Sequence, residues 1–194
     1  MSLIITQFLQ DQFVLSAAAE NARCVLLTGP IGVGKKELAQ WMHASSSRAS
    51  CPFIVVPLDG VPAAELEVAL YGVSGRRGAF ETARNGAVLL SDIDSLSLSQ
   101  QDTLLEVLRN GFFYPGGSSV PIPLHARLFF SSRHNLAQHT EEAQFRPELF
   151  RLLRAVWIKI PALSELGEDF GFLVHELLSE ICQRSNKNML SLSR

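Results

Sequence analysis

The sequence predicts an α/β protein built on a parallel β-sheet with helices on both of its faces. Two observations support this fold class. Short, almost uninterrupted apolar runs alternate along the chain with helix-like segments, which is typical of strands that are buried on both faces of a parallel sheet. The second observation is a glycine-rich segment, GPIGVGKK (29–36), which lies directly between an apolar run and a helical pattern.

Five apolar runs are expected to form the strands of this sheet. They are the segments 24–29, 53–58, 86–92, 126–132 and 155–160. Helices are expected over the segments 4–20, 35–44, 62–72, 98–111 and 164 to about 184. Ser97 or Ser99 is expected to cap the helix after the third strand, and Gly111 to end it. We therefore expect an α/β domain over residues 1–160, followed by the beginning of a helical subdomain over 161–194.

Composition and charge exclude several classes of protein. The 194-residue chain is 47% hydrophobic and 19% charged, which is typical of a globular protein with one good core. Its net charge of −2 argues against a broad surface for nucleic-acid binding. The three cysteines form no CxxC pair, so a disulfide framework or a zinc site is not expected and the cytoplasm is the natural compartment. No apolar run reaches the length of a membrane span.

The segment 29–36 fits the pattern G-x-x-x-x-G-K of phosphate-binding loops. Its glycines allow backbone N–H groups to turn toward phosphate oxygens, and the start of the following helix adds a partial positive charge. Lys35 is expected to reach the outer phosphates, whereas Lys36 stands where such loops usually carry a Ser or Thr that binds Mg²⁺. The candidate nucleotide site comprises Gly29, Pro30, Ile31, Gly32, Val33, Gly34, Lys35 and Lys36. A glycine-rich turn without a ligand is the alternative.

Four segments of the chain, taken in order, resemble the AAA+ domain of bacterial enhancer-binding proteins, the activators that work with sigma-54 RNA polymerase. They begin at Leu26, Cys51, Gly78 and Phe145, and the resemblance covers roughly residues 20 to 183. It implies a P-loop fold with a helical lid, ATP or ADP as ligand and Mg²⁺ as the metal. It also implies a ring-forming homo-oligomer in the full-length protein, RNA polymerase as a candidate partner, and DNA contact only through a domain outside this chain.

The same resemblance indicates that the hydrolysis site is altered. The family's third strand reads G-T-L-F-L-D-E-I, and Gly86 and Ile93 place this chain in register with it. Ser91 then stands at the metal-binding Asp and Asp92 at the catalytic Glu, whereas a shift of one residue would make Asp92 the metal ligand. A Ser hydroxyl is a weak ligand for Mg²⁺. In the shifted register, Ile93 would stand at the catalytic Glu. One of the two acids is therefore missing in either register. Asp94 is expected to cap a helix or lie at the surface.

Further positions of the family's catalytic machinery are changed. Pro57 stands where the family has an Asn that holds the catalytic Glu, and Arg133 stands where it has an Asn that senses the γ-phosphate. Arg146 matches the first of two arginines that the family supplies to the active site of a neighbouring subunit. The second falls on Leu152, with Arg151 beside it. A solvated helix face is the alternative explanation for these arginines.

The family's sigma-contacting loop, which carries the motif GAFTGA, is expected to be missing. The segment GAFETA (78–83) is similar to that motif, but its spacing from the third strand matches it to a later G-x-F-E-x-A segment of the family.

We therefore weigh three functions. The first is a nucleotide-binding regulatory module that hydrolyses ATP weakly or not at all and does not remodel sigma-54. The second is an active ATPase in which Asp92, Arg133 and Arg151 replace the missing groups, and the third is an oligomerisation module without nucleotide.

Overall fold

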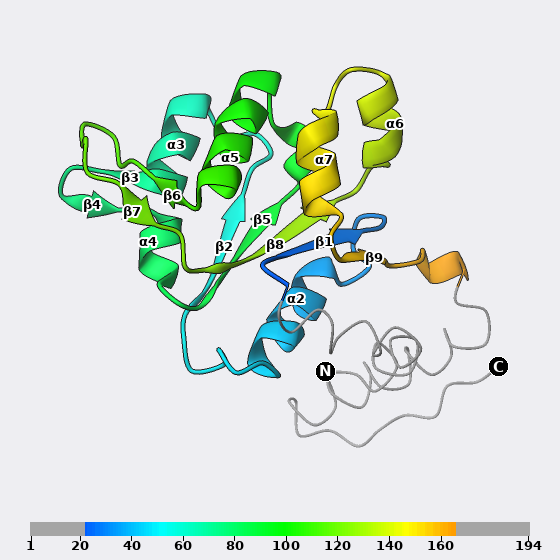
Figure 1. The fold of residues 1–194 in the computed structure, drawn as a ribbon. Helices are drawn as coiled ribbons and strands as arrows, with labels where there is room; N and C mark the ends of the chain where they lie inside the picture. Colours follow the sequence, from blue (N-terminus) through cyan, green and yellow to red (C-terminus); the bar gives the residue numbers. More distant parts are fainter. Residues whose placement is uncertain (1–21, 166–194) are drawn as a thin grey trace.

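A computed structural model describes residues 22–165, and its centre is a five-stranded parallel sheet (Figure 1). The strands are β1 (Cys24–Thr28), β2 (Phe53–Pro57), β5 (Ala87–Ser91), β8 (Arg127–Ser132) and β9 (Trp157–Lys159). They lie in the order β2-β5-β8-β1-β9, and every neighbouring pair is parallel. The five predicted strands and the parallel sheet are confirmed, although β9 is shorter than the predicted segment 155–160.

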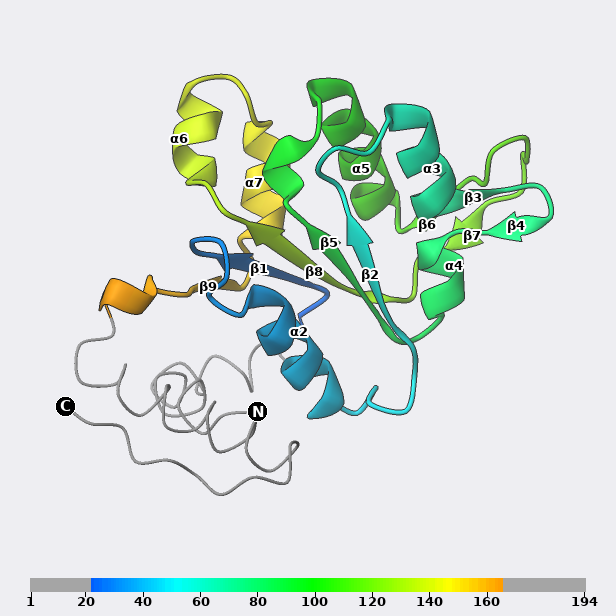
Figure 2. The same cartoon turned by 180° about the vertical axis from the view of Figure 1, so that it is seen from behind.

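The sheet separates two apolar cores. Along β1, Cys24 and Leu26 face the larger core, and Val25 and Leu27 face the smaller one, which is the period of two of a β-strand. Helices cover both faces, as Figures 1 and 2 show. The longer helices on the larger core are α3 (Ala63–Tyr71), α5 (Leu98–Asn110) and α7 (Pro147–Leu153), and the helix on the smaller core is α2 (Lys35–Ala44). Both sides of each central strand are thereby buried, which explains the continuous apolar runs.

Helix α5 has the capping residues that its sequence predicts. The Ser97 hydroxyl accepts a hydrogen bond from the Gln100 backbone N–H at 3.4 Å, and the Gln100 side chain accepts one from the Ser97 N–H at 2.8 Å. This reciprocal pair is a capping box, so Ser97 rather than Ser99 is the cap. The helix ends at Gly111, whose φ of 76° lies in the left-handed region.

Several small elements have no counterpart in the sequence prediction, because they are too short to show a period. They are the strands β3 (Gly72–Val73), β4 (Arg76–Arg77), β6 (Phe112–Phe113) and β7 (Ile122–Pro123), the helices α4 (Ala79–Ala83) and α6 (Leu136–Glu141), and the 3₁₀ turns η1 (Ile93–Ser95) and η2 (Leu163–Glu165). β3 and β4 form a hairpin, and so do β6 and β7. The two hairpins are joined, since the Ser74 N–H donates to the Gly116 carbonyl and the Gly116 N–H donates to the Gly72 carbonyl.

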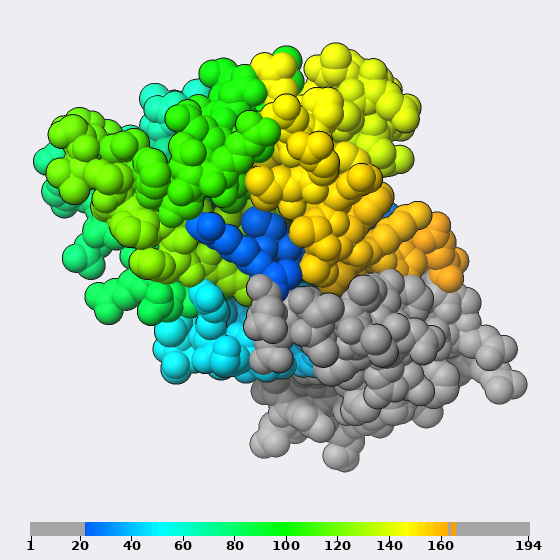
Figure 3. All heavy atoms as spheres, in the orientation of Figure 1, coloured from blue at the N-terminus to red at the C-terminus, as the bar shows by residue number. Residues whose placement is uncertain are grey.

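Two predicted helices, over 4–20 and over 164–184, lie outside the described residues apart from the short turn η2. The expected division at residue 160 therefore stays a prediction. Within residues 22–165, no helix is both long enough and apolar enough to cross a bilayer. In the space-filling view, the blue beginning of the described chain reaches the surface between green and yellow parts of the molecule (Figure 3).

Candidate nucleotide-binding site

The glycine-rich loop connects the end of β1 to the start of α2. The Gly29 N–H donates to the Ser132 carbonyl at 3.2 Å, which continues the pairing of β1 with β8 beyond the last residue of β1. A Cβ atom on Gly29 would lie 2.4 Å from the Ile160 carbonyl oxygen, so only glycine fits there. Gly32 and Gly34 have φ values of 82° and 88°, which glycine adopts without strain. The loop thus turns back over the first N–H groups of a helix, the geometry that binds phosphate in other proteins.

Lys35 is the first residue of α2, and its ammonium group lies over the loop. Its Nζ donates hydrogen bonds to the carbonyl oxygens of Gly29 at 2.6 Å and of Pro30 at 2.7 Å. The neighbouring Lys36 is exposed, as is Ile31 at the tip of the loop. The two lysines therefore differ: one is held against the loop and the other projects into solvent.

Three charged side chains act on the Lys35 ammonium. Burial is the main cause that lowers the pKa of Lys35, while the carboxylates of Asp92 and Asp94 oppose this shift and the guanidinium of Arg133 adds to it. These three residues follow β5 and β8, the two strands that lie between β1 and β2 in the sheet. The structure therefore brings the predicted Asp92 and Arg133 to the loop, and adds Asp94 to them.

The carboxyl ends of β2 and β5 lie side by side at this edge of the sheet. Pro57 is paired with Ser91 in the parallel register, so the two altered family positions are direct neighbours. Asp92 follows with a φ of 62°, a left-handed conformation that Asp adopts more readily than most residues. Its backbone N–H donates to the Ser131 hydroxyl at 3.2 Å, which fixes the turn against β8.

Arg133 connects two carboxylates at the same edge. Its Nη2 donates to Asp59 Oδ2, and its Nε lies 3.8 Å from Asp92 Oδ1, which is too long for a hydrogen bond. The Nε group is buried and has no hydrogen-bond acceptor among residues 22–165. The hydrogen bond to Asp59 is the main cause that raises the pKa of Arg133. A position that holds a neutral Asn in the family thus carries a guanidinium between two acids.

Asp94 is buried, so the expectation of a surface or helix-capping residue was wrong. Its side chain is 3% exposed, and Oδ2 accepts a hydrogen bond of 2.6 Å from His134 Nδ1. Burial alone would raise the pKa of Asp94, but the hydrogen bond from His134 and the nearby Ser132 hydroxyl outweigh it and leave the pKa below its usual value. Sequence reasoning missed this pair because its members are 40 residues apart. The sequence did indicate that each residue follows a predicted strand, and in a parallel sheet the carboxyl ends of the strands lie at one edge.

The two arginines expected to act on a neighbouring subunit lie on helix α7. Arg146, at the N-cap of α7, forms two hydrogen bonds with Asp102 of α5: Nε to Oδ1 at 2.8 Å and Nη2 to Oδ2 at 2.7 Å. Arg151 is exposed, and its side chain forms no hydrogen bond or ion pair within the described part of the chain. Neither arginine forms such a contact with the loop 29–36 of its own subunit, as far as residues 22–165 show.

The last strand holds the beginning of the loop. Trp157 Nε1 donates to the Thr28 hydroxyl at 2.8 Å, and the Ile160 N–H donates to the Thr28 carbonyl at 2.7 Å. The indole packs edge to face on Phe150 of α7, with 5.9 Å between the ring centroids. Thr28 immediately precedes Gly29, so β9 and α7 together fix where the loop starts.

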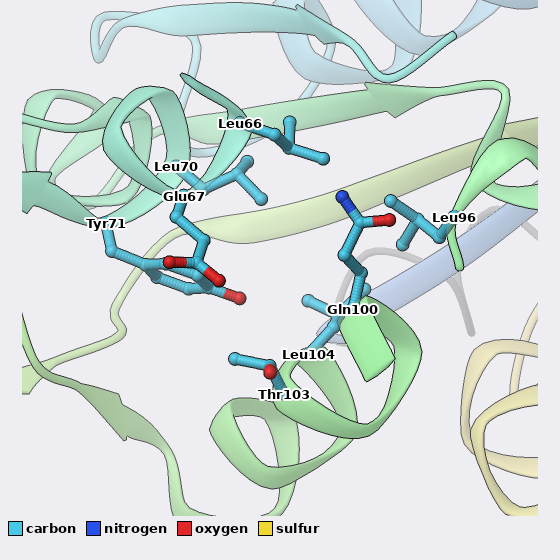
Figure 4. A pocket seen from close by; sticks show the side chains of 8 residues that line it. All are labelled: Leu66, Glu67, Leu70, Tyr71, Leu96, Gln100, Thr103 and Leu104. Carbon is cyan, nitrogen blue, oxygen red and sulfur yellow. The ribbon is translucent and has the colours of Figure 1, made fainter. Parts of the chain in front are cut away.

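Two hollows elsewhere on the surface lack the chemistry of a phosphate site. A small pocket between α3 and α5 (Figure 4) has a volume of about 10 Å³, which is the room that one water molecule needs. An open cleft of about 180 Å³ lies between α5 and β6, and its lining includes Tyr71, Phe112 and Tyr114. Neither lining includes a lysine or an arginine, so the glycine-rich loop remains the candidate site.

Solved structures with this fold include proteins in complex with nucleotide. Structures of NtrX from Brucella abortus, one in complex with ADP and one in complex with ATP, each match 100% of this chain with a TM-score of 0.84 and 28% identity. This chain covers 44% and 45% of those chains, respectively. The P-loop NTPase domain of the sigma-54 transport activator from E. coli has a TM-score of 0.57 over 81% of this chain and, at 16% identity, shares only the fold.

Curated relatives are transcription regulators of greater length. NtrC of Escherichia coli K12 is 32% identical over 180 residues, which are 88% of this chain and 38% of NtrC. GlrR of the same organism is 33% identical over 175 residues, which are 86% of this chain and 39% of GlrR. The chain therefore spans well under two thirds of these relatives. The family model described as the sigma-54 interaction domain matches residues 6–159. This chain thus belongs to the sigma-54 interaction domains, the AAA+ P-loop domains of NtrC-like transcription regulators.

Proposed function

We propose that this domain binds ATP or ADP at the loop 29–36 and serves as a regulatory module of a cytoplasmic transcription regulator, with weak or no hydrolysis of ATP. One observation carries the proposal: the glycines and Lys35 have the backbone turn and contacts of a phosphate-binding loop, while the acids beside the loop are altered. Gly29, Gly34 and Lys35 have the conformations and contacts of a phosphate-binding loop. The complexes of NtrX with ATP and with ADP support nucleotide binding by a chain of this fold.

The altered acids argue against fast hydrolysis. Phosphoryl transfer to water needs a residue that orients the water and cations that stabilise the charge on the phosphate. Asp92, which stands at the position of the catalytic Glu, is shorter than Glu by one methylene, and its carboxylate lies beside the Arg133 guanidinium. Ser91, which stands at the metal-binding Asp, offers only a neutral hydroxyl.

A second part of the proposal is that the domain does not remodel sigma-54 by itself. Strands β3 and β4 are joined only by Ser74 and Gly75, so the chain passes from α3 to α4 through a tight hairpin. This hairpin is the segment where the family carries its long sigma-contacting loop. A hairpin with so short a turn offers no extended loop to grip the sigma factor.

We further propose that the full-length regulator self-associates and that Arg146 then faces a neighbouring subunit. Arg146 and Arg151 are exposed enough to meet another chain, with 42% of the Arg146 side chain accessible. The chain of residues 1–194 alone is expected to be monomeric in dilute solution. A stable ring detected by light scattering without nucleotide would contradict this.

The active ATPase is the second candidate, and the exposed Arg151 guanidinium, which forms no ion pair with any residue of the range 22–165, favours it. Two measurements on the same preparation separate the candidates. Calorimetric titration with ATP and ADP tests binding, and release of inorganic phosphate tests turnover. We expect binding with phosphate release at background, and we expect the double variant Ser91→Asp/Asp92→Glu to raise the release. Turnover by the unaltered chain at rates typical of enzymes would favour the second candidate, and no binding at all would leave the oligomerisation module.

An open-complex assay with sigma-54 RNA polymerase, ATP and the full-length regulator tests the second part of the proposal. We expect no open complexes that depend on ATP. Their formation by the regulator alone would show that the short hairpin does not prevent work on sigma-54.

A further inference from the structure

The family implies a magnesium ion beside the nucleotide, but the residues of this site do not fit one. Mg²⁺ prefers oxygen ligands and is usually bound through one or two carboxylates. Lys36 places a cation where phosphate-binding loops usually carry a hydroxyl and where this family usually has Glu, and Ser91 replaces the carboxylate of the strand with a neutral group.

Each of the acids that remain near the loop lies beside a basic side chain. The Asp92 carboxylate lies beside the Arg133 guanidinium, with 3.8 Å between Oδ1 and Nε. Asp94 is buried, and its Oδ2 accepts the hydrogen bond from His134. Asp94 Oδ1 is buried and has no hydrogen-bond partner within residues 22–165. A magnesium ion bound there or at Asp92 would lie close to the cationic side chains of Lys35 and Arg133.

We propose that this site binds nucleotide without a divalent metal, and that the guanidinium of Arg133 supplies the positive charge that Mg²⁺ supplies in other P-loop proteins. This inference rests on the proposed nucleotide binding. The ligand is then the metal-free triphosphate, which carries more negative charge than its magnesium complex. Arg133 is in the right place, because the preceding residue, Ser132, accepts the N–H of Gly29. It is also close enough to lower the pKa of Lys35.

The present partners of Arg133 can be exchanged for a phosphate. The Asp59 side chain is 54% exposed, and ion pairs at such exposed positions contribute little stability. A guanidinium binds phosphate oxygens through two parallel hydrogen bonds, which is a stronger contact. The buried Nε of Arg133, which lacks an acceptor in the described chain, would gain one. Asp59 therefore competes with the nucleotide for Arg133.

The first test compares ATP binding with and without the metal. Calorimetric titration of the complete chain with ATP is performed once in EDTA and once in excess MgCl₂. The proposal predicts a dissociation constant in EDTA that equals the value in magnesium or lies below it. A P-loop protein that holds its nucleotide through the metal would give the opposite order. Binding that is about tenfold weaker or more in EDTA would overturn the proposal.

The second test compares a substitution that should weaken ATP binding with one that should strengthen it. Arg133→Gln removes the charge, and we expect ATP binding in EDTA to weaken about tenfold or more. Asp59→Asn removes the competing carboxylate but leaves Arg133, and we expect tighter binding, a gain that a damaged fold could not produce. Arg109→Gln is the matched control, since Arg109 forms an exposed ion pair with Glu148 on the surface of α5 and α7. Thermal unfolding of each variant checks that it is folded.

The outcomes separate this inference from the proposed function. If Lys35→Ala weakens binding about tenfold or more while Arg133→Gln and Asp59→Asn leave it unchanged, nucleotide binding stands and the role of Arg133 is wrong. If the unaltered chain binds ATP in neither buffer, both proposals fail. Opposite shifts for Arg133→Gln and Asp59→Asn in EDTA, with Arg109→Gln unchanged, would support the metal-free site.

Discussion

Replacement of Lys35 by alanine is the most direct perturbation of the candidate site. The Lys35 ammonium already donates two hydrogen bonds in the free protein, to the carbonyl oxygens of Gly29 and Pro30. When a phosphate binds, the ammonium exchanges these neutral acceptors for charged ones. The affinity that the lysine contributes is therefore the difference between the two sets of bonds, and not the full strength of the bonds to phosphate.

The size of this difference follows from typical hydrogen-bond energies. A hydrogen bond to a charged group contributes about 1.5–3 kcal/mol. Since the two bonds that are given up also involve the charged ammonium, we expect a net contribution of about 1.4–2.8 kcal/mol, which corresponds to a loss of about tenfold to a hundredfold in affinity. Alanine has the highest helix propensity, so the start of α2 should remain formed in the variant.

Calorimetric titration with ATP and with ADP measures this loss, and Lys159→Ala provides the control. The side chain of Lys159 on β9 is exposed and forms no hydrogen bond or ion pair with the loop among residues 22–165. Its removal therefore changes the net charge by the same amount, while its backbone remains paired with Thr28. We expect the control to bind like the unaltered chain. Equal affinities for Lys35→Ala and the unaltered chain would refute the assignment of the loop as a nucleotide site.

Three further predictions concern contacts around the site and the core. Because the pKa of Asp94 is lowered on folding, its charge stabilises the protein above the ordinary pKa of 3.8, and this contribution is lost as the pH falls through the lower folded value. The difference in unfolding free energy between the unaltered chain and Asp94→Asn, from urea titrations, should therefore shrink below pH 3.8, and a constant difference through the acid range would contradict this. Ser97→Ala should cost about 1 kcal/mol and lower the melting temperature by about 2–4 °C, whereas Ser99→Ala should change little. Asp102→Ala should cost less than about 1 kcal/mol in urea unfolding, because the side chains of Arg146 and Asp102 are 42% and 52% exposed, and a loss above about 2 kcal/mol would show that the pair is structural.

The larger elements of the fold could be predicted from the sequence because each has a continuous local pattern. The strand β5 is a run of apolar residues that is buried on both faces, and its burial is what makes the run visible. The hairpin of β3 and β4 has two residues in each strand, too few to show a period, and the hydrogen bonds that hold it in place go to Gly116 in a distant segment. No window of the sequence contains both partners, so a local pattern could not reveal it.

The candidate site likewise has one part that a local sequence pattern predicts and another part that depends on the tertiary fold. The loop 29–36 is a contiguous motif, and the structure gives it the expected position between a strand and a helix. The contacts of Arg133 with Asp59 and of His134 with Asp94 depend on the strand order β2-β5-β8-β1. That order places the residues after three separate strands side by side, and the sequence alone does not determine it.

The hydrogen bond between Trp157 and Thr28 gives the protein an optical reporter of its own. The chain contains two tryptophans: Trp157 is bonded to the residue just before the loop, and Trp41 lies on the helix that follows it. Indole emission depends on the polarity and hydrogen bonding of its surroundings. A change in the loop that lengthens or breaks the bond to Thr28 would therefore alter the emission spectrum. Occupancy of the loop can thus be followed in real time with unlabelled nucleotide, and Trp157→Phe and Trp41→Phe would assign the signal to one side of the loop or the other.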